Sequence, residues 1–183
     1  MTIEALAVLM IDTAERIGVD FMAVGAIAAG ACGVPRSAKD VEVNVAGGVD
    51  ALARALAPSI GFGPQVVFDT LTWGRRLVGS IRSTPPFKVE LFETFDHPFV
   101  QSEFSRRTKF FVPVLDRTTW LPTPEDVIVQ KLRWGRSKDL NDARDVLAVQ
   151  GPETLDMAYI GEWCARHGTA ARLAEALAGI PPL

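Results

Sequence analysis

The sequence predicts an α/β fold that is followed by a C-terminal helical region. Residues 21–45 run as an apolar strand, a glycine turn, a helix of small residues and a second strand. Residues 65–93 contain three further segments rich in β-formers, separated by glycine and proline. From residue 122 onward the apolar spacing becomes that of helices. We therefore expect an α/β core at 1–121 and a helical region at 122–183.

Composition indicates an ordinary globular protein. The chain has 183 residues, 22% of them charged and 48% hydrophobic, with a net charge of −3. This net charge excludes a protein whose surface is positively charged overall, as general binding to nucleic acid would require. Cys32 and Cys164 lack the spacing of a zinc site, which favours a reduced, cytoplasmic protein. The first 18 residues carry acids and no basic segment, so we expect neither a signal peptide nor a membrane span.

The elements of the core can be assigned in order along the chain. An amphipathic helix over 2–17 ends at Gly18, and a second helix over 49–58 follows the strand that opens at Asp40. Beyond residue 94 we expect a short irregular or helical piece and then one or two short strands. The predicted strands are 21–24, 40–45, 65–71, 75–83, 87–93, 109–115 and 118–121.

The helical region has clear start and stop signals. Thr123-Pro124-Glu125-Asp126 has the pattern of a helix N-terminus, and Gly135 ends that helix. The next helix is predicted to have Ser137 as its cap and to end before Gly151-Pro152. Two more helices are expected over 153–166 and 169–177.

Two acids stand at the start of the second strand. Asp40 and Glu42 are separated by one residue, so their side chains point to the same face of a strand. Both carboxylates can then meet one metal ion. Gly25, at the end of the first strand, allows backbone N–H groups to approach a phosphate beside a helix N-terminus. These parts suit metal-assisted phosphoryl or nucleotidyl transfer.

The order Gly25-Ala26, helix, Arg36-Ser37-x-x-Asp40-x-Glu42 resembles the core of the nucleotidyltransferase superfamily. The minimal nucleotidyltransferases and the AbiEii-type toxins are the most similar in appearance. That family's pattern is Gly-Ser or Gly-Gly and then Asp-x-Asp, so Ala26 and Glu42 depart from it. The resemblance implies a mixed, mostly antiparallel sheet with helices on one side.

The same resemblance implies a third carboxylate on a later strand, and Glu90 is the position that fits. Lys88, Glu90 and Phe92 share one face of the strand predicted over 87–93, and the residues between them are apolar. Glu90 is also what an alternating strand with one surface acid would show. Both interpretations are open.

A second motif lies in the helical region. Residues 124–143 resemble the downstream signature of the AbiEii-like enzymes, onto which Lys131, Arg136, Lys138, Asp139 and Asp142 fall. The resemblance implies that Lys131 contacts the nucleotide phosphates. It also implies that Asp139, the aspartate of the adjacent pair Lys138-Asp139, positions Lys131. The alternative is a plain helix–loop–helix corner, with acids in the first turn of a helix.

The residues flanking the acid pair leave two roles open. Arg36 and Lys39 either contact the triphosphate or pair with nearby carboxylates, and Ser37 either binds a phosphate or caps a turn. The full nucleotide-binding set is Gly25, Ala26, Arg36, Ser37, Lys39, Arg136, Lys138 and Asp139.

The resemblance implies Mg²⁺-dependent transfer of a nucleoside monophosphate from an NTP to an acceptor hydroxyl of RNA or protein, in a toxin–antitoxin or defence system. Asp40, Glu42 and Glu90 would hold one or two Mg²⁺ ions, with Lys131 completing the catalytic set. The rival hypothesis is a catalytically degenerate binding module, which the two glutamates favour. A third is an α/β protein whose motif is coincidental. The sequence specifies neither the NTP nor the acceptor.

Overall fold

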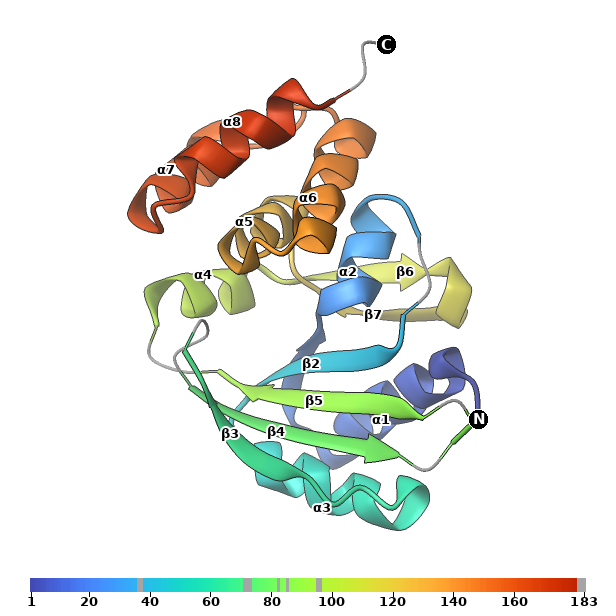
Figure 1. Ribbon diagram of the computed structural model, residues 1–183. Helices are drawn as coiled ribbons and strands as arrows, with labels where there is room; N and C mark the ends of the chain where they lie inside the picture. The colour runs from blue at the N-terminus through green and yellow to red at the C-terminus, as the bar shows by residue number, and fades with distance from the viewer. Residues whose placement is uncertain (36–37, 71–73, 82, 85, 95–96, 181–183) are drawn as a thin grey trace. The chain divides into compact units, whose positions relative to one another are not determined.

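The computed structural model describes residues 1–35, 38–70, 74–81, 83–84, 86–94 and 97–180 (Figure 1). The chain forms two compact units. The first comprises Met1–Ile27 and Ser37–Pro122, and the second comprises Ala28–Arg36 and Thr123–Leu183. None of the described helices is long and apolar enough to cross a membrane.

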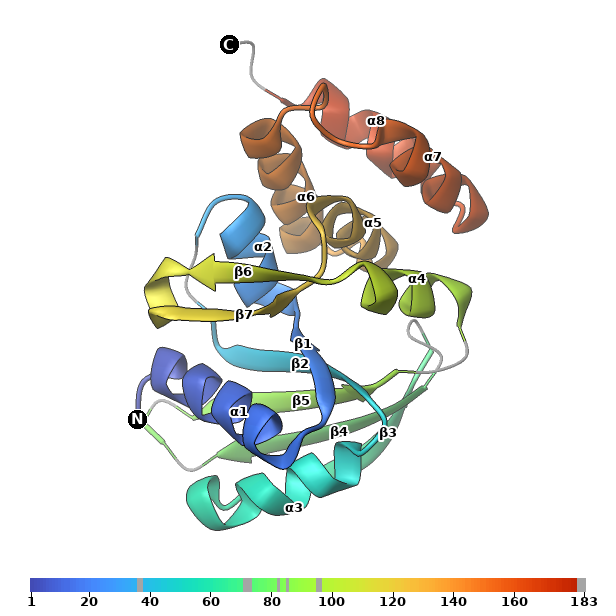
Figure 2. The same ribbon diagram turned by 180° about the vertical axis from the view of Figure 1, so that it is seen from behind.

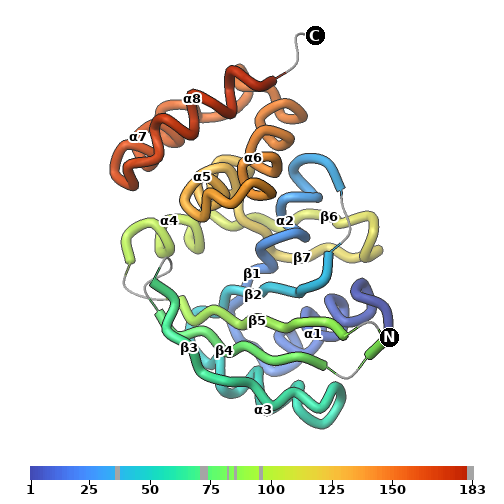
Figure 3. The backbone as a smooth tube through the Cα atoms, in the orientation of Figure 1, coloured from blue at the N-terminus to red at the C-terminus, as the bar shows by residue number. Residues whose placement is uncertain are grey.

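The first unit is built on a five-stranded sheet with the order β1-β2-β5-β4-β3. Strands β2 and β5 run parallel, and the other three pairs are antiparallel, which confirms the predicted mixed, mostly antiparallel sheet. The tube in Figure 3 shows β2 and β5 side by side at the centre of this sheet. The bounds are β1 Asp20–Ala23, β2 Asp40–Ala46, β3 Gln65–Asp69, β4 Gly74–Ile81 and β5 Phe87–Glu93.

Helices α1 (Ile3–Ile17) and α3 (Val49–Ile60) lie against one face of the sheet, as Figure 2 shows. That face is apolar because β2 turns its valines toward the helices, and Val41 and Val43 are each only 1% exposed. Arg75 ties α3 to the sheet, since its guanidinium pairs with Asp50 at 2.7 Å and with Glu93 at 2.9 Å. The opposite face of β2 and β5 carries the acids.

Helix α3 extends two residues beyond its predicted end at Pro58. The proline lies in the last turn, so the N–H that it lacks costs the helix only one hydrogen bond near its end. The helix ends when Gly61, at φ +62°, donates its N–H to the carbonyl of Ala57 at 2.8 Å.

A helix and a short hairpin complete the first unit. The piece after residue 94 contains helix α4 (Pro98–Arg106), and the hairpin is formed by β6 (Thr108–Val112) and β7 (Arg117–Leu121). Strand β6 ends three residues earlier than predicted, because the 3₁₀ turn η1 (Pro113–Leu115) begins with a proline that cannot continue the ladder.

The second unit is helical. Helix α5 begins after Thr123, whose hydroxyl accepts the N–H of Asp126, and Gly135 ends it at φ +66°. Helix α7 begins four residues later than predicted, because the carboxylate of Asp156 caps it by accepting the N–H of Tyr159 at 2.9 Å. The bounds are α5 Pro124–Trp134, α6 Ser137–Gln150, α7 Met157–Arg166 and α8 Ala170–Ala178.

Residues 28–36 join this helical unit, although the sequence places them in the core. They include most of α2 (Gly25–Cys32), whose last carbonyl accepts the side chain of Gln150 at 2.6 Å. A Cβ at Gly33 would lie 3.0 Å from Val146, so this glycine allows a close approach to α6. Burial raises the pKa of the Cys32 thiol to about 11, with a smaller contribution from Glu125, which fits a packed cysteine.

Candidate active site

Gly25 is the first residue of α2, two residues after the end of β1, and has a conformation that only glycine adopts readily. Its φ is +62°, and a Cβ built on it would lie 1.4 Å from the Oε2 atom of Glu42. The N–H of Val24 also donates to the backbone carbonyl of Glu42 at 3.0 Å. The glycine predicted to approach a phosphate thus gives room to the carboxylate of Glu42. Ala26 follows it in the first turn of α2.

The three predicted metal-binding acids share one face of neighbouring strands. In the parallel pair of β2 and β5, Asp40 lies opposite Lys88 and Glu42 lies opposite Glu90. Glu42 and Glu90 are 8% and 3% exposed, whereas Asp40 is half-buried and makes no ion pair or hydrogen bond through its side chain with the described residues. Two buried glutamates and one accessible aspartate therefore form the acidic face.

Two cations hold Glu90, and neither was predicted. The Lys88 ammonium pairs with Oε1, and the Nη1 atom of Arg76 lies 3.4 Å from Oε2. Arg76 comes from β4, and its Nη1 also lies 3.4 Å from Asp69 at the end of β3. The alternation in 87–93 already places Lys88 on the face of Glu90. Arg76 and Asp69 depend on cross-strand register, which no local pattern specifies.

These acids supply the hard oxygen donors that Mg²⁺ takes. Asp40, Glu42 and Glu90 have the right chemistry and lie at adjacent register positions. Within the part of the chain that the structure describes, no three carboxylate, histidine or cysteine side chains converge closely enough to hold a metal ion. Both oxygens of Glu90 face cations of the protein. The three acids therefore fit Mg²⁺ by the chemistry of their donors, and Glu90 is held by Lys88 and Arg76.

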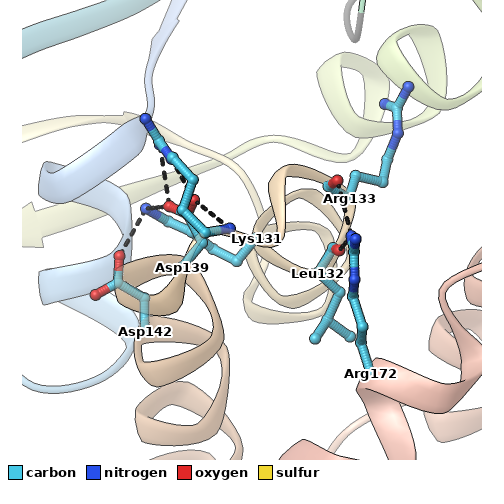
Figure 4. A network of polar contacts seen from close by, with 7 residues as sticks. Lys131, Leu132, Arg133, Asp139, Asp142 and Arg172 are labelled. Atoms are coloured by element: carbon cyan, nitrogen blue, oxygen red, sulfur yellow. Dashed lines mark hydrogen bonds and ion pairs between the residues drawn. The ribbon is translucent and has the colours of Figure 1, made fainter.

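The second unit contains a buried ion cluster around Lys131 (Figure 4). The Lys131 ammonium lies 2.7 Å from Asp142 and 3.6 Å from Asp139. Lys131 is 4% exposed and the two aspartates are 5% and 0% exposed. The ammonium of Lys131 thus lies near Asp139, the aspartate expected to position it, but Asp142 is the nearer partner. Because all three side chains are buried, the pairing compensates their charges and contributes to the stability of the fold.

Asp139 also anchors the start of α6. Its carboxylate accepts the backbone N–H of Arg136 at 3.3 Å and the Nε–H of the same residue at 2.5 Å. Arg136 is consequently the N-cap residue, and Ser137, predicted as the cap, is the first residue of the helix. Lys138 is exposed and makes no ion pair or hydrogen bond through its side chain with the described residues.

Arg172, which was not predicted as a site residue, caps the C-terminal end of α5. Its guanidinium donates to the carbonyl of Leu132 at 2.7 Å and to that of Arg133 at 3.2 Å (Figure 4). A side chain at Gly135 would collide with it at 2.3 Å. This is the usual role of a cation at a helix C-terminus.

Three of the predicted nucleotide-binding residues come shortly before β2 in the sequence. Arg36 and Ser37 lie outside the described residues. Lys39 is exposed, and its ammonium forms no ion pair in the described part of the chain. Its backbone carbonyl accepts the N–H of Lys88 at 3.1 Å, which continues the pairing of β2 with β5 by one residue.

The fold is similar to that of known nucleotidyltransferases. A structure of the antibiotic-resistance factor ANT(2'')-Ia in complex with adenylyl-2''-tobramycin matches with a TM-score of 0.64 and 14% identity, over 91% of this chain and 99% of that one. The lincosamide antibiotic adenylyltransferase LnuA, with lincomycin bound, gives a TM-score of 0.54 and 10% identity, over 81% and 98%. A nucleotidyltransferase-like protein from Paracoccidioides brasiliensis gives 0.51 and 18%, over 98% and 94%.

No family model matches the sequence, and no curated protein matches it either. The likeness to the solved structures extends over nearly the whole length of both chains, although the identities are low. It includes the mixed sheet on whose central strands the acids lie. The chain therefore has the nucleotidyltransferase fold.

Proposed function

We propose that this protein transfers a nucleoside monophosphate from an NTP to an acceptor hydroxyl, with release of pyrophosphate. The observation that carries the proposal is the placement of Asp40, Glu42 and Glu90 on one face of two adjacent strands, directly beside the Gly25 turn. Metal-assisted nucleotidyl transfer needs several carboxylates close together, and here they lie beside a strand–turn–helix unit. The fold shared with nucleotidyltransferases supports the same chemistry.

In this proposal Asp40, Glu42 and Glu90 hold one or two Mg²⁺ ions. When bound, the metal would offset the negative charge at the α-phosphate and activate the acceptor oxygen. Asp40 is the accessible ligand, since the structure gives its carboxylate no partner among the described residues. Glu42 lies against the turn at Gly25, where the absence of a side chain gives its carboxylate room.

The remaining predicted residues are assigned to the nucleotide phosphates. The backbone of Gly25 and Ala26 at the start of α2 offers N–H groups, and Lys39 offers an ammonium that has no ion pair among the described residues. Lys131 adds a positive charge that Asp139 and Asp142 keep in one orientation. We also assign Arg36, Ser37, Arg136 and Lys138 to this set.

For the acceptor, the proposal includes three sources of a hydroxyl. The antibiotic adenylyltransferases of the same fold suggest a small molecule, and the resemblance to AbiEii-type toxins suggests an RNA end or a protein side chain. In the second case the protein would act in the cytoplasm within a toxin–antitoxin or defence system. Incubation with radiolabelled NTP and each class of acceptor distinguishes them by the molecule that becomes labelled.

The test of the proposal does not depend on the acceptor. Each of the four NTPs is titrated with Mg²⁺ into the wild type, Asp40→Ala and Glu15→Ala by calorimetry. We expect metal-dependent binding to the wild type and to Glu15→Ala, whose exposed acid lies on α1. Asp40→Ala should lose it. Absence of binding for all four NTPs to folded wild type would overturn the proposal.

One observation favours a second candidate, a nucleotidyltransferase fold that binds a partner without catalysis. Both oxygens of Glu90 face protein cations, and the described acids do not converge on a metal position. A degenerate site would keep this arrangement at every Mg²⁺ concentration. NTP binding that is unaffected by Mg²⁺, together with no transfer to any acceptor, would favour this candidate.

A further inference from the structure

Glu90 is neutralised by two cations that are held very differently. The side chain of Lys88 is 46% exposed, and its ammonium has only Glu90 as an ion-pair partner in the described structure. The side chain of Arg76 is 26% exposed, and its Nη1 atom is shared between Glu90 and Asp69. The Arg76 guanidinium also lies 5.5 Å from the centre of the Phe92 ring. Arg76 is anchored at three points, and Lys88 at one.

Lys88 lies on the acidic face, next to two of the predicted metal ligands. Lys88 lies opposite Asp40 in the parallel ladder, two residues before Glu90 on the same face. Its ammonium neutralises Oε1 of Glu90 on that face, beside the acid whose carboxylate has no described partner. A lysine has a long flexible stem and a compact charge, so it can withdraw into solvent without disturbing the strand.

We propose that Lys88 is an internal counter-ion that occupies Glu90 in the metal-free protein and yields it to Mg²⁺, while Arg76 remains as a positioning residue. The inference rests on the proposed function, because it concerns the same three acids. It explains why acids of suitable chemistry and register do not converge on a metal position in this conformation. The ammonium and Mg²⁺ compete for the Oε1 atom of Glu90.

Competition of this kind has a measurable sign. Lys88→Gln removes the competing charge, so we expect the affinity for Mg²⁺ to rise about fivefold, the size of a half-exposed ion pair. Lys88→Arg keeps the charge and can grip the carboxylate with two N–H groups, so the affinity should fall. Arg76→Gln removes the guanidinium that holds the Oε2 atom of Glu90 in place, so the affinity for Mg²⁺ should fall in this variant as well. A merely structural role for Lys88 would not give opposite effects in the Gln and Arg variants.

The experiment is a calorimetric titration of MgCl₂ into the nucleotide-free protein, repeated at saturating ATP. The variants are wild type, Lys88→Gln, Lys88→Arg and Arg76→Gln. Lys109→Gln serves as the control, because it removes one exposed charge from β6, where the described structure gives the ammonium a Trp120 ring and no acid. Thermal unfolding with and without Mg²⁺ gives a second readout, since the metal should raise the Tm of Lys88→Gln more than that of the wild type.

Equal Mg²⁺ affinity in Lys88→Gln and wild type would overturn the counter-ion inference. If ATP still bound in a metal- and Asp40-dependent way, the proposed function would stand. Failure of every variant to bind either Mg²⁺ or Mg²⁺ with ATP would overturn both. Should Lys88→Gln not fold, a loss of affinity in Lys88→Arg supports the inference, and an unchanged affinity there contradicts it.

Discussion

The acidic face of the sheet and the Lys131 cluster both pair lysine with carboxylates, but they differ in their access to water. Lys131, Asp139 and Asp142 are all at most 5% exposed. On the sheet, Glu90 is equally buried, whereas the side chain of Lys88 is 46% exposed. The buried cluster has taken three charges out of water, and the Lys131 ammonium compensates both carboxylates. The sheet cluster keeps one cation that can exchange with a ligand.

The difference in exposure predicts that the buried cluster contributes mainly to stability and the sheet cluster mainly to binding. A buried ion that loses its partner leaves an uncompensated charge, which costs the folded state directly. A half-exposed ion that loses its partner is solvated instead, so its removal changes the site more than the fold. Four predictions test this division, beginning with the largest expected effect.

Lys131→Met should lower the free energy of unfolding by about 3–5 kcal/mol, because the buried carboxylates of Asp139 and Asp142 would lose the ammonium that lies between them. Urea denaturation measures the change. Lys138→Met is the matched control in the same unit, since that exposed lysine has no ion pair among the described residues. Adding Asp142→Leu to Lys131→Met should recover part of the loss. A change below about 1 kcal/mol in the single variant would contradict the burial of the cluster.

Gly25→Ala should destabilise the protein by about 1–2 kcal/mol from its left-handed backbone alone. The new methyl group also meets the carboxylate of Glu42, so that side chain must rotate away from the turn, and Mg²⁺ affinity should fall with it. Gly63→Ala is the control, because a Cβ there meets nothing within 4 Å. Equal stability of the two variants would show that the turn at Gly25 is not strained by a side chain.

Asp40→Asn should change the free energy of unfolding by less than about 0.5 kcal/mol, because its carboxylate has no partner among the described residues. Its affinity for Mg²⁺ with NTP should nevertheless fall at least about tenfold, which corresponds to the loss of one ligand charge. Calorimetry and urea denaturation on the same preparation separate the two effects. A large loss of stability without a loss of binding would place Asp40 in the fold rather than in the site.

Arg136→Gln should lower the free energy of unfolding by less than about 1 kcal/mol and leave Mg²⁺ binding unchanged, because its side chain is 55% exposed. Asp139 keeps Lys131 and can still accept the backbone N–H of residue 136. Chemical denaturation compares this variant with Lys131→Met. Similar losses in the two variants would mean that exposure does not distinguish the members of the cluster.

The sequence predicted the elements well because their signals are local. Gly18 and Gly135 end helices as expected, and the alternation around Glu90 correctly placed Lys88 and Glu90 on one face. What it could not predict depends on pairing between distant segments. Arg76 reaches Glu90 only because β4 pairs with β5 in one register, and no pattern within residues 74–81 specifies that register.

Gly25 shows a different limit. The sequence predicted that a backbone turn without a side chain is needed there, and the positive φ agrees. The neighbour that fills the space is the carboxylate of Glu42, 17 residues later in the chain. Its extra methylene relative to aspartate allows it to reach the turn, so the departure from the Asp-x-Asp pattern has a steric counterpart. The metal-binding roles of the acids remain predictions.

Asp139 has a consequence for how the helical unit opens. The same carboxylate caps the start of α6 and pairs with Lys131 from α5, so one side chain supports both the end of a helix and the contact between two helices. The backbone amides of the two helices should therefore exchange with deuterium as one cooperative unit, with a common opening free energy. Asp139→Asn would weaken this coupling. The amides at the start of α6 should then exchange earlier than those of α5, and local fraying would replace concerted opening.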